Sequence, residues 1–230
     1  MLKKRIIPKF LFKFQNINGK LLPTFVISNK FSNLKTVGSI IPQAKIYEAQ
    51  LADELMLLNI IDKKSSEDTD FLGFLKKFSE QIFMPLTVGG GVKSLECFKV
   101  LLNNGADKIF INSEAINNPD LIGSVSKKFG SQCVVVGIDF KQIKNDKFFV
   151  FSKSGKINTN LDLFEWAKKC ENLGAGEIVV TDIERDGTNR GLNIDIAKKL
   201  SKLIKIPLIF GGGCGLASHF VDGFKKTNID

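Results

Sequence analysis

Residues 84–98 read MPLTVGGGVKSLECF, and residues 206–220 read IPLIFGGGCGLASHF, so one pattern occurs twice in the chain. In each copy a proline precedes a short apolar run, three glycines and a segment that can begin a helix. Such an apolar run is typical of a buried parallel strand. Glycines at its end let backbone N–H groups approach an anion at the positive end of the next helix. The repeat predicts a duplicated scaffold with two phosphate sites, and therefore a substrate that carries a phosphate at each end.

The composition is typical of a globular α/β protein. The chain has 230 residues, of which 43% are hydrophobic and 25% charged, and this fits one large domain or two small ones. No apolar run approaches the roughly 20 residues of a membrane span. The start MLKKRIIPKF lacks the pattern of a signal peptide. We therefore expect a cytoplasmic protein without a membrane partner.

The formal net charge is +9, but the lysines are scattered along the chain. A nucleic-acid-binding protein would cluster its basic residues and interleave them with aromatic ones. We therefore expect no nucleic-acid partner. The surplus of positive charge instead favours a phosphorylated small-molecule substrate.

The cysteines and the single histidine exclude several kinds of site. The four cysteines stand far apart without metal-ligand spacing, so we expect reduced, mostly buried thiols, no metal and no other cofactor. His219 falls on a predicted helix and is interpreted as a packing or surface residue. Acid–base chemistry would therefore depend on carboxylates or lysine.

Strand-like runs alternate with amphipathic segments of helix length. The pattern predicts strands at 6–12, 55–60, 86–88, 108–112, 134–139, 178–182 and 208–210, with extra β pairs near 20–27 and 147–153. It predicts helices at 40–49, 95–104, 119–129, 163–173 and 194–202, and one more from about residue 217. No low-complexity linker interrupts the series. Residues 1–230 are therefore interpreted as one α/β domain of the (βα)8 TIM-barrel type rather than a doubly wound sheet.

Only seven of the eight strands of such a barrel can be counted. A helix follows the seventh strand, and the chain then reads TNID. The sequence predicts a C-terminally incomplete barrel, without strand 8 and the final helix, whose first and seventh strands expose unpaired edges. Either the chain is truncated or something else completes the barrel.

The order and spacing of several motifs resemble one family. KRIIP, DELMLL, PLTVGGGV, GADKIFINS, FGSQCVVVGID, GAGEIVVTDIERDGT and PLIFGGGCG are similar, in this order, to HisF, the cyclase subunit of imidazole glycerol phosphate synthase. The resemblance implies a twofold repeated (βα)8 barrel that receives ammonia from a glutaminase (HisH-like) subunit in a heterodimer. The implied substrate is a ribulosyl aminoimidazole carboxamide nucleotide with two phosphates. The implied products, in histidine biosynthesis, are imidazole glycerol phosphate and an aminoimidazole carboxamide nucleotide.

The resemblance also implies the residues that bind the substrate. A first phosphate site would contain Gly91, Asn112 and Ser113, and a second would contain Gly187 and Gly213. Thr181 and Asp186 would line the top of the site. A tight turn is the alternative explanation for each glycine, but two matched copies favour phosphate binding.

One of two expected acid–base residues is missing. The family has an Asp at the end of strand one and another at the end of strand five, and the second is present as Asp139. Aligning IIPKFLFK with VVVGIDFK places Leu11 opposite Asp139, and leucine can neither donate nor accept a proton. Asn59 stands where the family has an Asp, and Pro23 stands where a phosphate-contacting Lys is expected. The loss of an acid–base group typically costs about 10²–10⁴ in rate.

Charged residues at the starts of four strands match the ring that closes the bottom of this family's barrel, where ammonia enters. Charges that point into a barrel mouth are costly unless they pair, so their joint presence is informative. The alternative is four unrelated surface charges. The predicted ammonia gate consists of Arg5, Glu54, Lys108 and Glu177.

Three functions remain open. The first is the ammonia-dependent cyclase of histidine biosynthesis. The second is a non-cyclising subunit that passes ammonia to a sugar amidotransferase, because HisF-like paralogues encoded with surface-glycan genes resemble this chain in the apolar residue at Leu11. The third is a truncated, inactive remnant.

Overall fold

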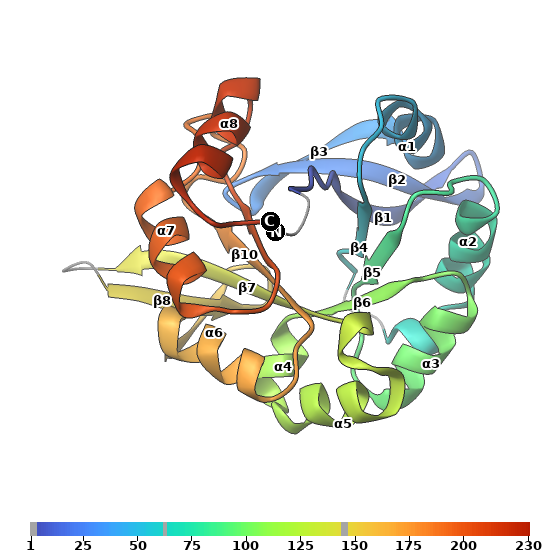
Figure 1. Ribbon diagram of the computed structural model, residues 1–230. Helices are drawn as coiled ribbons and strands as arrows, with labels where there is room; N and C mark the ends of the chain where they lie inside the picture. Colours follow the sequence, from blue (N-terminus) through green and yellow to red (C-terminus); the bar gives the residue numbers. More distant parts are fainter. Residues whose placement is uncertain (1–3, 62–63, 144–146) are drawn as a thin grey trace. The chain divides into compact units, whose positions relative to one another are not determined.

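The structure is a computed structural model that describes residues 4–61, 64–143 and 147–230. As far as these residues are described, the chain divides into two compact units (Figure 1). The N-terminal unit holds residues 5–27 and 34–111. The C-terminal unit holds residues 112–230, together with residue 4 and residues 28–33.

The N-terminal unit is a mixed sheet with helices. Its strands follow the spatial order β6-β5-β4-β1-β2-β3. β1, β4, β5 and β6 run parallel, and β1 pairs with β2 in the antiparallel direction. The strands are β1 (Lys9–Ile17), β2 (Lys20–Asn29), β3 (Ser32–Ser39), β4 (Leu55–Asn59), β5 (Leu86–Gly89) and β6 (Lys108–Ile111). The helices are α1 (Ile40–Ala49), the short η1 (Ser65–Glu67), α2 (Thr69–Ser79) and α3 (Leu95–Asn103).

The C-terminal unit repeats this plan. Its strands follow the order β11-β10-β7-β8-β9, with β7, β10 and β11 parallel and with β8 antiparallel to both β7 and β9. The strands are β7 (Val134–Ile143), β8 (Lys147–Ser152), β9 (Ile157–Asp162), β10 (Glu177–Asp182) and β11 (Leu208–Gly211). The helices are α4 (Ser113–Asn117), α5 (Asp120–Phe129), η2 (Ser131–Cys133), α6 (Leu163–Asn172), α7 (Ile194–Leu203) and α8 (Ala217–Lys226).

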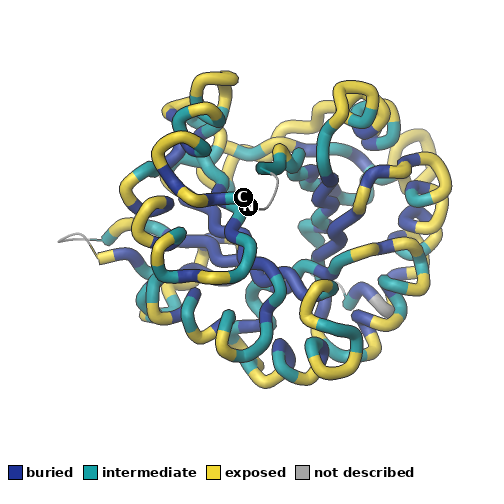
Figure 2. The backbone as a smooth tube through the Cα atoms, viewed as in Figure 1, coloured by how far each residue is buried: buried dark blue, intermediate teal, exposed yellow. Residues whose placement is uncertain are grey.

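Phenylalanine packing joins helices to strands in each unit. In the N-terminal unit the fully buried ring of Phe12 lies 5.6 Å from the ring of Phe71 and 5.4 Å from that of Phe74, both on α2. In the C-terminal unit the ring of Phe148 on β8 lies 6.0 Å from that of Phe140 on β7 and 6.3 Å from that of Phe164 on α6. The parallel strands are accordingly largely buried, while the outer faces of the helices are exposed (Figure 2).

Aspartate side chains cap the first turns of two of these helices. The carboxylate of Asp68 accepts a hydrogen bond from the N–H of Phe71 at the start of α2. The carboxylate of Asp162 accepts from the N–H groups of Phe164 and Glu165 at the start of α6. Each carboxylate satisfies N–H groups that have no partner within the helix, and thereby fixes where the helix begins.

The predicted α/β class and the alternation of parallel strands and helices are confirmed, including both extra β pairs. Seven parallel strands occur in the described ranges. The predicted bounds of two strands were wrong. β1 begins at Lys9 instead of residue 6, because Pro8 has no N–H to donate to a ladder. β1 and β7 also continue past residues 12 and 139, because their second halves pair with β2 and β8.

Candidate functional site

Asp139 lies in β7 of the C-terminal unit, where the strand leaves the parallel sheet. It is buried, and it stands opposite Thr181 of β10 in the ladder. The side-chain Nδ2 of Asn112 donates a hydrogen bond to Oδ2 of Asp139 over 2.6 Å. The structure therefore brings together three predicted site residues, namely Asp139, Asn112 and Thr181. A buried carboxylate with an amide donor is a suitable acid–base group.

Leu11 occupies the corresponding place in the N-terminal unit. Asp139 pairs with Thr181 on its parallel side and with Phe151 on its antiparallel side. Leu11 likewise pairs with Leu58 on its parallel side and with Val26 on its antiparallel side. The register of the two units thus supports the alignment of Leu11 with Asp139, and the N-terminal unit carries no carboxylate at this position.

Ser113 begins α4 directly after Asn112. Its Oγ accepts a hydrogen bond from the backbone N–H of Lys153 over 3.0 Å. Nearby in the C-terminal unit, Nζ of Lys141 donates to the carbonyl oxygen of Gly155 over 3.1 Å. These contacts hold the turn between β8 and β9 onto the carboxyl ends of the parallel strands.

Asp186 and Gly187 lie in the loop after β10 and contact the tip between β2 and β3. Oδ2 of Asp186 accepts from Oγ of Ser28 over 3.2 Å, and its carbonyl oxygen accepts from the N–H of Lys30 over 2.9 Å. The carbonyl oxygen of Gly187 accepts from Nδ2 of Asn29 over 3.0 Å. Gly187 has φ +70°, and a Cβ there would stand 2.5 Å from the carbonyl oxygen of Ser28. Close backbone approach is therefore one physical reason for this glycine.

Gly213 has the same kind of environment. It has φ +98°, and a Cβ there would stand 2.3 Å from the carbonyl oxygen of Gly191. The N–H of Gly191 also donates to the carbonyl oxygen of Gly213. In the N-terminal unit Gly91 has φ +67°, and its carbonyl oxygen accepts from the N–H of Ser65. All three glycines thus have backbone conformations that other residues rarely adopt, and their role in phosphate binding stays a prediction.

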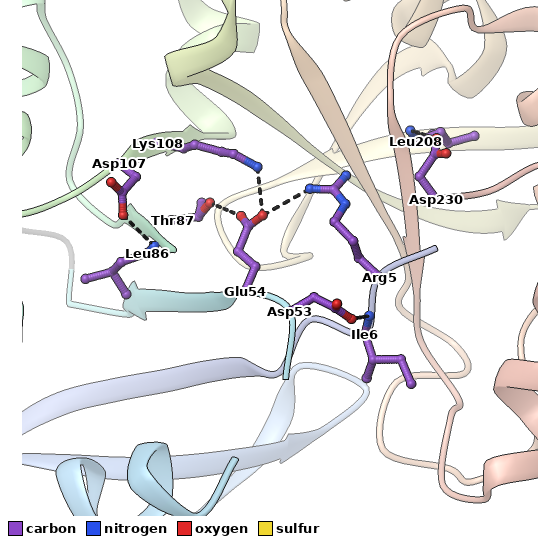
Figure 3. Close-up of polar contacts among 10 residues, drawn as sticks. All are labelled: Arg5, Ile6, Asp53, Glu54, Leu86, Thr87, Asp107, Lys108, Leu208 and Asp230. Atoms are coloured by element: carbon purple, nitrogen blue, oxygen red, sulfur yellow. Dashed lines mark hydrogen bonds and ion pairs between the residues drawn. The ribbon is translucent and has the colours of Figure 1, made fainter. Parts of the chain in front are cut away.

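Three of the four predicted gate residues form one ionic cluster in the N-terminal unit (Figure 3). Glu54 directly precedes β4, and only 3% of its surface is exposed. Its Oε2 accepts from Nη1 of Arg5 over 3.0 Å and from Nζ of Lys108 over 2.7 Å. Its Oε1 accepts from Oγ1 of Thr87 over 2.6 Å. The two cations and the hydroxyl compensate the burial of this carboxylate.

The fourth predicted gate residue belongs to the other unit. Glu177 is the first residue of β10, where it pairs with Val135 of β7, and it is buried. It thus lies at the amino end of its strand, as Lys108 does in β6.

Sequence reasoning missed a set of aspartates, each of which makes two hydrogen bonds to the backbone of a residue at or before the start of a neighbouring strand. In the N-terminal unit, Oδ2 of Asp107 accepts from the N–H of Leu86 over 2.8 Å, and the N–H of Asp107 donates to the carbonyl oxygen of Leu86 over 2.9 Å (Figure 3). Asp53 makes the same two contacts with Ile6. Both aspartates directly precede a residue of the ionic cluster. That position in DELMLL and GADKIF is the signal that could have identified them.

The C-terminal unit contains one such pair at β11. Oδ2 of Asp230 accepts from the N–H of Leu208 over 3.1 Å, and the N–H of Asp230 donates to the carbonyl oxygen of Leu208 over 2.9 Å (Figure 3). Leu86 and Leu208 are equivalent residues of the two repeated segments. The duplication therefore extends from the sequence to the hydrogen bonds at the strand starts.

A further buried carboxylate, Asp182, holds the loop after β10. Its Oδ1 accepts from the N–H of Glu184 over 3.1 Å, and its Oδ2 accepts from Nδ2 of Asn193 over 3.1 Å. Nε of Arg185 lies 3.7 Å from Oδ2. Burial raises the pKa of Asp182 above its ordinary value, and the contacts with Asn193 and Arg185 oppose that shift.

Two general features complete the description. None of the helices in the described part of the chain combines the length and apolar character that crossing a membrane requires. Within the same residues, no three His, Cys, Asp or Glu side chains are grouped as metal ligands. No disulfide joins cysteines among the described residues. Cys97 and Cys170 are buried, whereas Cys133 and Cys214 are half-buried, so the expectation of mostly buried thiols holds for two of the four.

Comparison with known proteins gives a consistent result. Residues 23–230 match the family described as "Histidine biosynthesis protein". The chain is 42% identical over 227 residues to the imidazole glycerol phosphate synthase subunit HisF of Hydrogenobaculum sp. (strain Y04AAS1), covering 99% of this chain and 86% of that protein. It is 43% identical over 232 residues to the subunit of the same name from Lactococcus lactis subsp. cremoris (strain SK11), covering 100% and 86% of the two chains. A third protein of that name, from Clostridium botulinum (strain Okra / Type B1), is 45% identical over 201 residues, or 87% and 79% of the two chains.

Proposed function

Since this chain belongs to the histidine biosynthesis protein family, we propose that it is a HisF-type subunit of imidazole glycerol phosphate synthase. Ammonia would react with a ribulosyl aminoimidazole carboxamide nucleotide that carries two phosphates. The products would be imidazole glycerol phosphate and an aminoimidazole carboxamide nucleotide. The observation that carries this proposal is the buried carboxylate of Asp139, held by Asn112 at the carboxyl end of β7.

Asp139 would transfer protons during ring closure. It stands opposite Thr181 in the ladder, and Asn112 fixes its carboxylate. Proton transfer during ring closure would depend on this carboxylate alone, because Leu11 provides no second one. We therefore expect cyclase turnover that is slower by about 10²–10⁴ than with a pair of carboxylates. Gly91, Ser113, Asp186, Gly187 and Gly213 would bind the two phosphates and the groups between them.

The cluster around Glu54 would form the ammonia gate. The carboxylate is buried between Arg5 and Lys108 at the amino ends of the strands, whereas Asp139 lies toward a carboxyl end. In the family that this chain resembles, ammonia enters at the amino ends of the strands and reacts at their carboxyl ends. Glu177, at the start of β10, would contribute to the same function.

Exposed apolar residues of the N-terminal unit support a protein partner at this end. Phe83 and Leu51 are 83% and 86% exposed, and both precede parallel strands of the sheet. The N–H of Phe83 donates to Oε1 of Glu48 in α1, which ties these two segments together. Exposed apolar side chains that lie on linked segments are suited to a protein interface when together they form a patch. The partner would be a glutaminase subunit that releases ammonia.

Leu11 favours a second candidate function. Without a proton-transferring group in the N-terminal unit, the chain could deliver ammonia and leave the chemistry to another enzyme, such as a sugar amidotransferase. The gate and the partner surface would then be used, and Asp139 would not.

A turnover assay distinguishes these functions. The purified chain is mixed with the bis-phosphorylated nucleotide and an ammonium salt, and imidazole glycerol phosphate is quantified. We expect slow formation that Asp139→Asn slows further, by about 10²–10⁴ in rate, and that Leu11→Asp increases. If neither the natural chain nor Leu11→Asp forms product while both remain folded, the cyclase proposal is wrong and ammonia delivery is favoured.

Partner binding is tested separately by co-purification with a glutaminase subunit. Leu51→Ser combined with Phe83→Ser should weaken the association, whereas Ile157→Ser, at an exposed apolar residue of β9, should not. Equal retention by both variants would refute the surface assignment.

A further inference from the structure

The side chain of Asn112 does not cap the helix that follows it, although its position would allow this. It follows β6 and occupies the N-cap position of α4, where asparagine side chains commonly accept from helix N–H groups. Its side chain makes no such capping bond. Instead, Nδ2 donates to Oδ2 of Asp139 over 2.6 Å. The side chain is thus directed at the candidate acid–base group.

The chemistry of this contact fixes the orientation of the amide. A carboxylate only accepts hydrogen bonds, so the amide must present its NH2 group to Asp139. A donor bonded to a charged oxygen forms a short, strong hydrogen bond, as the distance here indicates. The carbonyl oxygen Oδ1 of Asn112 must therefore point elsewhere.

Oδ1 of Asn112 is buried, and among the described residues no donor satisfies it. Buried polar atoms are almost always hydrogen-bonded, because an unsatisfied one loses its bond to water without compensation. An unsatisfied acceptor next to a candidate acid–base group is available to a hydrogen-bond donor of a bound ligand.

This ligand group cannot be a phosphate dianion. A phosphate dianion offers only acceptor oxygens, and Oδ1 is itself an acceptor. The carboxylate of Asp139, bonded to the same amide, would also repel a second anion. The group that satisfies Oδ1 must carry a hydrogen on nitrogen or oxygen, as do an amine, a carboxamide and a sugar hydroxyl.

We propose that Asn112 is a positioning residue for Asp139 and that its Oδ1 accepts a hydrogen bond from an N–H or O–H group of the substrate. The proposal rests on the proposed function, because it takes Asp139 as the acid–base group. It replaces the sequence-based assignment of the Asn112 side chain to a phosphate. Phosphate binding would fall to Ser113 and to the glycines.

Kinetics test whether Asn112 acts through Asp139. Asn112→Ala should lower kcat by about 10- to 100-fold, because a small misplacement of a reacting group can cost about 10² in rate. In the Asp139→Asn background the same change should lower kcat less than threefold, because the group being positioned is gone. Full additivity of the two losses would overturn the positioning role. Asn172→Ala, at the exposed end of α6, is the matched control and should change nothing.

Ligand binding tests the role of Oδ1. Asn112→Ala should weaken binding of the bis-phosphorylated nucleotide by about tenfold and leave binding of inorganic phosphate unchanged. A parallel loss of inorganic phosphate binding would show that Asn112 is a phosphate ligand and would refute the proposal. Asn112→Leu, which has a similar side-chain shape and removes both the donor and the acceptor, serves if Asn112→Ala does not fold.

A spectroscopic readout separates this proposal from the proposed function. In protein labelled with carbon-13 at aspartate carboxyl groups, the signal absent from Asp139→Asn identifies Asp139. That signal should shift in Asn112→Ala and stay in place in Asn172→Ala. If the Asp139 signal shifts but the chain shows no turnover, the contact between Asn112 and Asp139 is supported and the cyclase function is contradicted. If the signal does not shift, the positioning role is contradicted, whatever the activity.

Discussion

Asn59 and Asp182 form the same turn in the two units. Oδ1 of Asn59 accepts from the N–H of Ile61 over 3.1 Å, and Oδ1 of Asp182 accepts from the N–H of Glu184 over 3.1 Å. Each of these residues ends a parallel strand that precedes one of the repeated glycine segments. The side-chain oxygen accepts a hydrogen bond from the backbone two residues further on, which forms the turn that Asn and Asp commonly make. The duplicated sequence therefore leads to a duplicated loop geometry, even where one copy has an amide and the other a carboxylate.

Gly90 and Gly212 are expected to be intolerant of substitution. A Cβ on Gly90 would stand 2.1 Å from the carbonyl oxygen of Asn59, and one on Gly212 would stand 2.5 Å from that of Asp182. Both also have positive φ, +106° and +99°. Gly90→Ala and Gly212→Ala should each lower the free energy of unfolding by about 2–4 kcal/mol, measured by urea denaturation.

Gly73→Ala is the control for those variants. Gly73 lies inside α2, and a Cβ there would meet no atom within 4 Å. Because alanine favours the helix more than glycine, this change should raise the free energy of unfolding by about 0.5–1 kcal/mol. Destabilisation by all three substitutions to a similar extent would contradict the close-approach explanation.

Asp182 should make stability depend on pH. Its pKa is raised in the folded state, so at pH values between the unfolded and the folded pKa the folded chain binds more protons than the unfolded chain. The contribution of Asp182 to the free energy of unfolding therefore decreases as pH rises through this window above 3.8. Asp182→Asn should remove this component and keep the turn, as Asn59 does. Denaturation of both proteins across the window provides the measurement, and identical slopes would disprove the assignment.

Glu54→Gln should destabilise the N-terminal unit. The substitution keeps the shape of the side chain but leaves Arg5 and Lys108 without their shared negative charge. We expect a loss of about 3 kcal/mol in the free energy of unfolding, because Glu54 is buried. Glu67→Gln, which removes the exposed ion pair with Lys64, should leave stability nearly unchanged because solvent screens that pair. An equally small effect of both changes would argue against the cluster.

Two thiols should react slowly. Burial raises the pKa of Cys170 to about 12 and that of Cys214 to about 11, from an ordinary value of 9.0. At pH 8, iodoacetamide should therefore alkylate Cys214 about a hundredfold more slowly than in urea-unfolded protein, and Cys170 more slowly still. Mass spectrometry of the labelled peptides measures both rates. Labelling of folded Cys214 at the unfolded rate would show that its thiol is not shielded.

Much of the fold could be predicted from short-range patterns. The apolar runs at 55–60, 86–88 and 208–210 contain enough buried side chains to define strands by themselves, and helix α1 was predicted with its observed bounds. The start of β1 was not predictable from hydrophobicity, because Ile6 continues the apolar run. What excludes it from the strand is Pro8, together with the contacts between Ile6 and Asp53.

The composition of the site was more accessible to sequence reasoning than its contacts. The sequence by itself determined that the chain is duplicated, that Asp139 has an apolar counterpart in Leu11, and that charged residues precede several strands, because each of these is a property of residue type and spacing. Only the tertiary structure decided that the side chains of Arg5, Thr87 and Lys108 donate hydrogen bonds to the carboxylate of Glu54. It also decided that the side-chain amide of Asn112 donates a hydrogen bond to Asp139. Those contacts join residues far apart along the chain, and they depend on the register of paired strands and on side-chain direction, which no local pattern encodes.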